Sequence, residues 1–344
     1  MSLSTLSRGP VGPARPADRG PISAAVLAYL REPDPDALRR LGVDDLADAG
    51  TDPFGEDLHL ALYVAYELHY RGFADVPADL EWDPELIRLR RDLEEIFLAG
   101  LRARVPGGAD VDAALAALLQ ESGEEGISHH LARRASIEQF REYVALRSIY
   151  HLKEADPQAW VIPRLEGAAK AALVTVEHDE YGAGRPERMH AHLFAEMMRE
   201  LGLDAGYGAH LDRAPGAVLA EVNLMSLCGL RRSLRGALVG QFAVVELTSS
   251  PGSARLVRAA ERLGCGPASV EFYAEHVEAD AVHEQLVRHA LIAPLVRAEP
   301  ALAADVVFGV QAATVLDADV GAAVLDAWRE GRSALRALSP APHP

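Results

Sequence analysis

Three kinds of residue are scarce in this 344-residue chain: cysteines, aromatic residues, and basic residues relative to acidic ones. Only Cys228 and Cys265 are present. Two thiols cannot supply the four cysteine ligands that most structural zinc or iron–sulfur sites use. They also do not form the disulfide framework of a small secreted domain, so we expect a reducing, cytoplasmic setting.

The deficit of positive charge excludes two classes of partner. The chain has 34 Lys and Arg against 51 Asp and Glu, a formal net charge of −17. Nucleic-acid binding and binding to anionic membranes both need basic surfaces. Because 49% of the residues are hydrophobic and 25% are charged, the composition is that of a folded globular protein. We therefore expect most of the acid to be solvated surface.

Several local patterns are also missing. Residues 1–21 are rich in Ser, Gly, Pro and Arg without an apolar stretch, so we expect a disordered tail and no signal peptide. No window has the roughly 18 uninterrupted apolar residues of a membrane span. Neither a phosphate-binding loop nor a dinucleotide-binding glycine motif is present.

Helical periodicity dominates the rest of the chain. Strand-like alternation is weak and aromatic residues make up only 6%, which favours an all-α fold. We expect helices at 36–48, 55–72, 84–104, 109–121, 136–155, 157–180, 186–202, 216–227, 230–249, 252–263, 267–289 and 301–329. The polar segment 121–127 is the expected boundary between an N-terminal helical region, 22–125, and a C-terminal core, 126–338; one continuous domain is the alternative.

The most informative pattern is His276, Asp280 and His283 within FYAEHVEADAVHE. On a helix, residues spaced i, i+4 and i+7 leave one face within an arc of about 60°. Two imidazoles and a carboxylate on one face suit iron, manganese or zinc. A solvated polar face is the alternative.

Two further segments carry ligand-type residues. Glu180 ends one expected helix, Gly182 and Gly184 break it, and Pro186 begins the helix that carries His190. This turn could bring Glu180 and His190 together, although a plain helix–turn–helix connection explains the glycines equally well. Upstream, Glu154 lies near the end of the preceding helix, where a solvated carboxylate is the usual outcome.

Taken together, Glu154, the Glu180–Gly184 turn with His190, and His276, Asp280 and His283 resemble the iron-containing redox enzymes, the haem-oxygenase-like di-iron oxidases and oxygenases. The spacing is most similar to that of N-oxygenating, nitrosourea-forming members. The resemblance covers roughly residues 130–335. It implies an all-α, haem-oxygenase-like helical bundle with an N-terminal helical extension, no haem, and two Fe(II) ions.

The resemblance also implies a division of ligands and an activity. Glu180, His190 and His283 are assigned to one iron, and Glu154, His276 and Asp280 to the other, whose binding can be labile. The implied reaction is O2-dependent N-oxygenation of a small amine or amino-acid-derived substrate, with an external electron donor. The alternatives are C–C cleavage or desaturation of an amino or fatty acid, a manganese–iron pair, and a metal-free helical binding protein or hydrolase-like relative.

Other charged or ligand-type residues have simpler interpretations. Glu67 and His69 are two residues apart on a helix and face different ways, so we do not expect them to form a site. For the N-terminal region we expect a structural role, either packing on the core or forming a homodimer interface. His129 and His130 are expected at the surface. Arg231, Arg232 and Arg235 form a basic stripe that could bind a substrate carboxylate, although a salt-bridged helix face is commoner.

Overall fold

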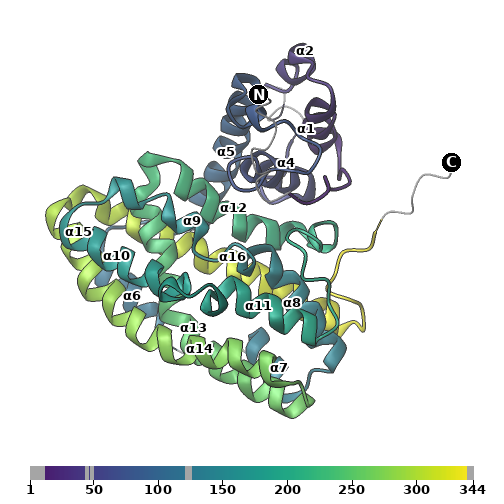
Figure 1. Ribbon diagram of the computed structural model, residues 1–344. Helices are drawn as coiled ribbons and strands as arrows, with labels where there is room; N and C mark the ends of the chain where they lie inside the picture. The colour runs from purple at the N-terminus through teal and green to yellow at the C-terminus, as the bar shows by residue number, and fades with distance from the viewer. Residues whose placement is uncertain (1–11, 43–45, 47–49, 121–125, 339–344) are drawn as a thin grey trace, which may run out of the picture.

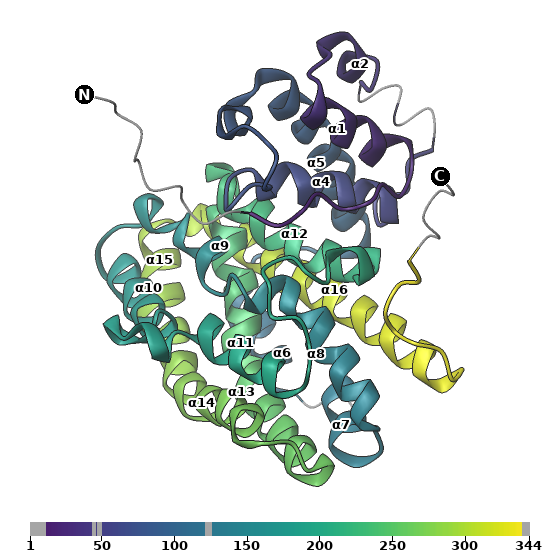
Figure 2. The same cartoon turned by 45° about the vertical axis from the view of Figure 1, so that its right-hand side comes forward.

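The computed structural model describes residues 12–42, 46, 50–120 and 126–338. Within these ranges the secondary structure consists of helices and turns, without a strand. The prediction of an all-α bundle with an N-terminal helical extension is therefore confirmed. Figures 1 and 2 show the helices of residues 21–104 gathered on one side of the larger C-terminal bundle, whereas the helix at 111–118 lies in that bundle.

The N-terminal region is built from helices, of which the one at residues 84–104 is amphipathic and begins at a capped residue. Its elements are α1 (Pro21–Arg31), α2 (Pro35–Arg39), α4 (Glu56–Glu67), the 3-10 helix η1 (Ala78–Trp82), α5 (Pro84–Arg104) and α6 (Val111–Leu118). Asp83 caps α5 by accepting hydrogen bonds from the backbone N–H groups of Glu85 and Leu86, and Pro84 follows at the first helical position. The buried residues of α5 recur at helical spacing and form one apolar face.

The C-terminal bundle contains the longer helices. Its elements are α7 (Ile127–Arg133), α8 (Ile137–His151), α9 (Asp156–Ala159), η2 (Ile162–Arg164), α10 (Gly167–Glu180), η3 (Gly182–Gly184), η4 (Pro186–Arg188), α11 (His190–Glu200), η5 (Leu211–Arg213), α12 (Gly216–Leu230), η6 (Arg232–Leu234), α13 (Arg235–Leu263), α14 (Pro267–Gln285), η7 (Leu286–Ile292), α15 (Ala293–Ala298), η8 (Pro300–Leu302) and α16 (Ala303–Arg329). Helices α13 and α14 run side by side, joined by a tight turn at Gly264 (Figure 1). The segment η7 is a π-helical continuation of α14.

Close packing of α13 against α16 depends on two glycines. A Cβ atom on Gly240 would lie 2.0 Å from the carbonyl oxygen of Val306, and one on Gly309 would lie 2.0 Å from that of Ala237. Only residues without a side chain let the two backbones approach this closely.

The N-terminal region packs directly on the core through α4 and α12. Every residue of α4 from Leu58 to Glu67 is buried, and α12 is buried on nearly all sides. Between them, Asn223 donates a hydrogen bond to the carbonyl oxygen of His59 at 2.8 Å. Helix α12 is therefore the element that the two parts share.

The expected tail at residues 1–21 needs correction where the structure describes it. Residues 1–11 lie outside the described residues. Residues 12–20 lie against the protein: Arg15 forms an ion pair with Asp75, and Arg19 contacts Glu56 at 2.6 Å. Arg19 also donates to the carbonyl oxygen of Leu211 at 2.8 Å. These charged contacts hold a segment whose composition alone suggested disorder.

Some expected helix boundaries also differ. Helix α13 continues through Pro251, where the sequence suggested a break. The helix packs against α14 and α16, and this packing holds it together across the proline. The expected helix 157–180 is interrupted at η2 by Pro163, and α10 begins at Gly167 with φ +54°. Helices α1 and α7 were not predicted. Most of the expected boundary segment, residues 121–125, lies outside the described residues.

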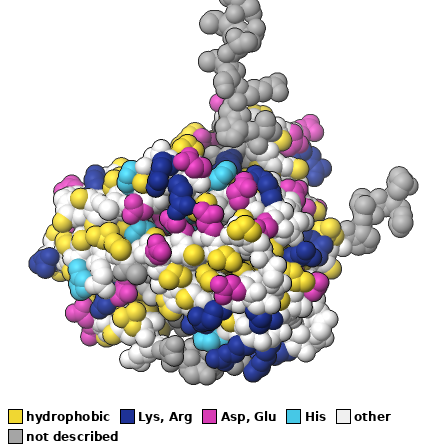
Figure 3. Space-filling view, turned by 60° about the horizontal axis from the view of Figure 1, so that its bottom comes forward, with side chains coloured by type: hydrophobic (Ala, Val, Ile, Leu, Met, Phe, Trp, Pro, Cys, Tyr) yellow, Lys and Arg dark blue, Asp and Glu magenta, His cyan; other side chains and the backbone are white. Residues whose placement is uncertain are grey.

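The surface carries mixed charge. On the face in Figure 3, acidic, basic and hydrophobic side chains are interspersed. Among the described residues, one helical run, Pro300–Arg329, is long and apolar enough to cross a membrane by length and composition. Half of its most apolar window is buried inside the protein, and a core helix passes the same test.

Candidate metal centre

Seven acidic and histidine side chains converge in the interior of the bundle. They come from the α8–α9 turn, the end of α10, the start of α11, the middle of α13, and α14. Each is at most 8% exposed. The seven are Glu154, Glu180, His190, Glu246, His276, Asp280 and His283.

The seven residues fall into two groups. Glu154, His190 and His276 form one group, and Glu180, Glu246, Asp280 and His283 form the other. Within each group one ligand-type atom from every residue lies within 4.8 Å of all the others. The groups adjoin, because Nδ1 of His190 is 2.6 Å from Oε2 of Glu180.

The register of α14 places its three residues on one side, as the sequence predicted. Nδ1 of His276 donates a hydrogen bond to the carbonyl oxygen of Phe272 at 2.8 Å, which leaves Nε2 facing the cluster. A backbone carbonyl on one ring nitrogen is the usual way in which a metal-binding histidine is oriented. About two turns further on, Nδ1 of His283 lies 3.1 Å from Glu246 and 3.5 Å from Asp280.

A tight turn brings Glu180 and His190 together. Gly182 has φ +73°, and a Cβ atom there would lie 2.6 Å from the backbone nitrogen of Met189. Ala183 also lies in the left-handed region, with φ 52°. Backbone strain of this kind costs on the order of 1 kcal/mol and is found preferentially at functional sites.

Glu154 lies in a second strained turn. Helix α8 ends at His151, and Ala155 has φ 73° before α9 begins. Nδ1 of His151 lies 2.7 Å from Oε1 of Glu154, so this carboxylate oxygen is held by a hydrogen bond. The other oxygen, Oε2, points to Nε2 of His276 at 3.7 Å. His151 therefore orients Glu154 toward the cluster.

Aromatic side chains cover this end of the cluster. His151 stacks on Phe194 with ring centroids 4.8 Å apart, and Phe194 meets Phe272 edge to face at 5.0 Å. Phe272 in turn packs on His276 at 4.5 Å. The apolar wall excludes water from the histidine and carboxylate groups, which strengthens their electrostatic interactions.

The carboxylates create a strongly cation-attracting field. Burial lowers the pKa of His276, but the Glu154 and Asp280 carboxylates outweigh it and raise that pKa to about 10. For His283, burial likewise opposes Asp280 and Glu246, which raise the pKa to about 11. Burial raises the pKa of Glu246 to about 8, against the neighbouring His283. Without a metal, the cluster therefore holds protons in its place.

The orientation of the side chains fits metal ligands better than a hydrogen-bond network. In the described part of the chain, five buried atoms of the cluster lack a hydrogen-bond partner: Oε2 of Glu154, Oε2 of Glu180, Nδ1 of His190, Nε2 of His276 and Oδ2 of Asp280. The short His190–Glu180 distance is not aligned for a hydrogen bond. Buried polar atoms left unpaired are costly, so lone pairs that converge in this way are typical of an ion site.

The donor set matches two divalent ions. Four carboxylates carry four negative charges, which balance the four positive charges of two divalent metals, and neutral imidazoles complete the ligand shells. Nitrogen and oxygen donors without thiolates suit iron or manganese.

The arrangement differs from the sequence expectation in two ways. Asp280 groups with Glu180 and His283, whereas His190 groups with Glu154 and His276, so the expected division between the ions is exchanged at these two residues. Glu246 was missed. Its only signal in the sequence is a single acid within the apolar run Ala243–Leu247 of a predicted helix.

The remaining candidates lie elsewhere. Glu67 is fully buried and binds Lys153 at 3.2 Å, and His69 lies 3.1 Å from Glu81. Neither belongs to the two groups. His130 is half-buried and stacks on Trp328 at 5.3 Å, so it is not a freely exposed residue.

A small cavity lies beside the cluster. It has a volume of about 300 Å³ and is lined by residues of the 179–190 turn and α14, His190 among them. Three carboxylates (Asp179, Glu275 and Glu278) and two arginines (Arg185 and Arg188) share its wall. This cavity reaches the cluster at His190, and its lining carries both signs of charge.

Comparison with protein families identifies the class. Residues 141–318 match the family of iron-containing redox enzymes, and the chain belongs to this family. The matched range contains all seven residues of the cluster. A search of curated proteins found no match.

Proposed function

We propose that the protein is a non-haem di-iron enzyme that uses O2 to oxidise a small amine or amino-acid-derived substrate, with N-oxygenation as the reaction. The observation that carries the proposal is the convergence of four buried carboxylates and three histidines whose free atoms lack hydrogen-bond partners. Membership of an iron-containing redox family supports the choice of metal. Two bound irons would supply the activation of O2.

Each residue of the site would have a separate role in binding iron or in orienting an iron ligand. Glu154, His190 and His276 would hold one iron, and Glu180, Glu246, Asp280 and His283 the other. His151 orients the Glu154 carboxylate. Asp179 lies 3.4 Å from Nε2 of His283 and orients the imidazole of His283. The aromatic wall keeps water away.

The cavity supports an amine or amino acid as substrate. Its carboxylates would attract an ammonium group, and Arg185 could receive a carboxylate. Arg185 is exposed and has no ion pair among the described residues, whereas Arg188 binds Glu271 at 3.0 Å and also Glu275. Both cysteines are unbonded, which agrees with the cytoplasm as the proposed compartment.

An anaerobic titration with Fe(II) tests the metal centre. We expect the metal-free protein to bind two irons, with a visible-absorption change when O2 is admitted. Binding of fewer than one iron would contradict the proposal and favour a metal-free helical protein. Binding of two irons without any optical response to O2 would contradict the use of O2.

Mass spectrometry of the products distinguishes the reactions. The iron-loaded protein is given O2, a reductant and a panel of amines, amino acids and fatty acids. N-oxygenation adds oxygen to an intact substrate, desaturation removes two hydrogens, and C–C cleavage shortens the carbon chain. Either of the last two products, in place of an oxygenated amine, would replace N-oxygenation as the assigned activity.

A further inference from the structure

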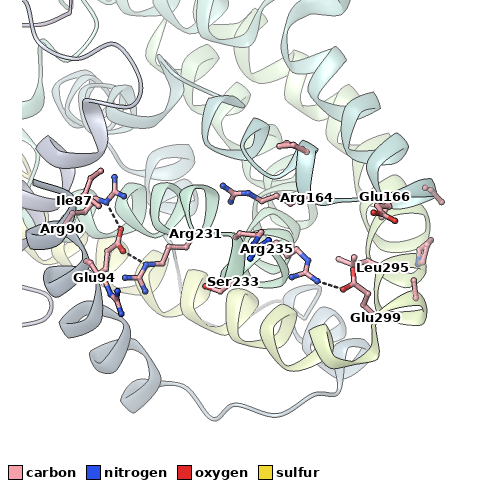
Figure 4. Close-up of a pocket in the computed structure, with 18 residues that line it drawn as sticks. Ile87, Arg90, Glu94, Arg164, Glu166, Arg231, Ser233, Arg235, Leu295 and Glu299 are labelled. Atoms are coloured by element: carbon pink, nitrogen blue, oxygen red, sulfur yellow. Dashed lines mark hydrogen bonds and ion pairs between the residues drawn. The ribbon is translucent and has the colours of Figure 1, made fainter. Parts of the chain in front are cut away.

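A large cleft outside the metal centre is lined mainly by arginine. It has a volume of about 1350 Å³ and opens where α5, the start of α10, η6 with the start of α13, and α15 meet (Figure 4). Six arginines line it against three glutamates, although the chain as a whole has a net charge of −17. We name it the arginine cleft; its six arginines are Arg90, Arg91, Arg164, Arg231, Arg232 and Arg235.

One end of the arginine cleft is built on a buried carboxylate. Glu94 is 2% exposed and contacts Arg90 at 3.3 Å and Arg231 (Figure 4). It also accepts a hydrogen bond from the hydroxyl of Tyr66 at 3.0 Å. One carboxylate cannot neutralise two guanidinium groups, so a positive charge remains there. Glu94 accepts a hydrogen bond from Nε of Arg231 and attracts Arg90 by charge alone, so both arginines are held beside this carboxylate.

The middle of the cleft has arginines without an acidic partner. Arg164 donates to the carbonyl oxygens of Gly229 and Leu230, the latter at 3.0 Å, and these contacts leave its charge uncompensated. Arg232 is exposed, and its side chain makes no hydrogen bond or ion pair with another described residue. Burial lowers the pKa of Arg164, and the nearby charge of Arg232 lowers it further. An anion between them would relieve this repulsion.

The arginine cleft is distinct from the metal centre. Gly167, at the start of α10, lines the cleft, whereas Glu180 ends the same helix. Thirteen residues at a rise of about 1.5 Å each separate the two positions by roughly 20 Å. A ligand in the cleft therefore does not reach the seven clustered residues.

We propose that the arginine cleft binds a small organic polyanion, carrying several phosphate or carboxylate groups, between Arg164 and Arg232. Guanidinium groups spread along the cleft match separated negative charges, and planar guanidinium forks bind both phosphate and carboxylate. Its apolar wall of Ile87, Pro163 and Leu295 would contact the organic part. A long polyanion is disfavoured, because the net charge of the protein repels it beyond the cleft.

Calorimetric titration of the full-length protein tests the proposal. The probes are inorganic pyrophosphate and citrate at low ionic strength, and at least one is expected to bind with micromolar to low-millimolar affinity. Tighter binding of pyrophosphate indicates a phosphorylated ligand, and tighter binding of citrate a polycarboxylate. Failure of both probes to bind at about 10 mM would overturn the proposal.

A pair of variants locates the site. Arg232→Glu is expected to weaken binding at least tenfold, because it reverses a charge in the cleft. Arg258→Glu is the matched control: Arg258 is exposed on α13 and does not line the cleft, so this variant should bind the probe as the unchanged protein does. Arg91→Glu, which changes an exposed side chain at the Glu94 end of the cleft, should also weaken binding. Equal losses in the cleft variants and the control would show a general charge effect and overturn the assignment.

Discussion

Glu246 lies on α13, apart in the sequence from every other residue of the cluster. Its carboxylate is 4% exposed and 3.1 Å from Nδ1 of His283. In Glu246→Gln the group around His283 loses one negative charge, so we expect its metal affinity to fall by about 10- to 100-fold. Metal analysis after equilibrium dialysis against limiting Fe(II) should show one tightly bound iron instead of two.

Glu177→Gln is the control for this experiment. Glu177 is buried near the cluster but belongs to neither group, so its replacement should leave two bound irons. If both variants retain two irons, Glu246 is not a ligand.

Glu177 also predicts a pH dependence of stability. Burial, reinforced by the charges of Glu180 and Glu246, raises its pKa to about 9, whereas the unfolded chain titrates near 4.3. Between these values the folded state retains a proton that the unfolded state releases, so an increase in pH lowers the free energy of unfolding. In metal-free protein, Glu177→Gln should therefore be more stable than the parent by on the order of 2–4 kcal/mol at pH 8.

Urea unfolding at several pH values, with a chelator present, measures this effect. The advantage of Glu177→Gln should shrink steadily as the pH falls and disappear near pH 4, where Glu177 is protonated in both states. An advantage that is the same at every pH would mean that the substitution acts through packing and not through the charge.

At the scale of elements, the crossing of α13 and α16 leaves no space for a side chain at Gly240 or Gly309. Gly240→Ala places a methyl group against the backbone of Val306, and we expect a loss of about 1–3 kcal/mol in the free energy of unfolding. Gly252→Ala, on the same helix, is the matched control, because an added Cβ there meets nothing within 4 Å. The control should gain up to about 1 kcal/mol from helix propensity. Similar urea midpoints for both variants would contradict the close approach.

A buried ion pair joins α4 to the turn that carries Glu154. Nζ of Lys153 lies 3.2 Å from Oε2 of Glu67, which also accepts a hydrogen bond from Tyr207 at 2.9 Å. Lys153 in addition lies over the rings of Tyr63 at 4.7 Å and Tyr70 at 4.2 Å. The pair is thus enclosed by the N-terminal region on one side and by the core on the other.

Lys153→Met should destabilise the protein by about 3–5 kcal/mol, because it leaves the Glu67 carboxylate buried without its partner. The double variant Glu67→Gln/Lys153→Met removes both charges and should recover much of that loss. A double-mutant cycle in urea measures the difference. Strictly additive losses would show that the two side chains do not interact.

At the scale of the whole molecule, α12 makes the N-terminal region part of the fold. Removing residues 1–126 would expose the surface of α12 that α4 covers. We therefore expect the fragment 127–338 to aggregate or to unfold without a cooperative transition, as monitored by size-exclusion chromatography and circular dichroism. A soluble fragment with a cooperative transition would make the core independent of the N-terminal region. Light scattering of the full-length protein tests the predicted homodimer separately.

The sequence determined the parts of this protein that depend on local spacing. Helical periodicity predicts the all-α class, and the i, i+4, i+7 spacing of His276, Asp280 and His283 places them on one helix face whatever surrounds that helix. The glycines at 182 and 184 likewise predict the turn before His190. Such features follow from the backbone within a few residues, so they can be read from the chain alone.

Only the tertiary structure decided which distant residues meet. Glu246 joins the cluster because α13 packs along α14. His190 groups with Glu154 because the turn before α11 and the turn after α8 bring these two residues together. The arginine cleft likewise combines four segments. In one of them Arg231 and Arg235 form the expected salt bridges, with Glu94 and Glu299, and these partners come from distant helices. The physical reason is that contacts between residues far apart in sequence depend on how helices pack, which no local pattern specifies.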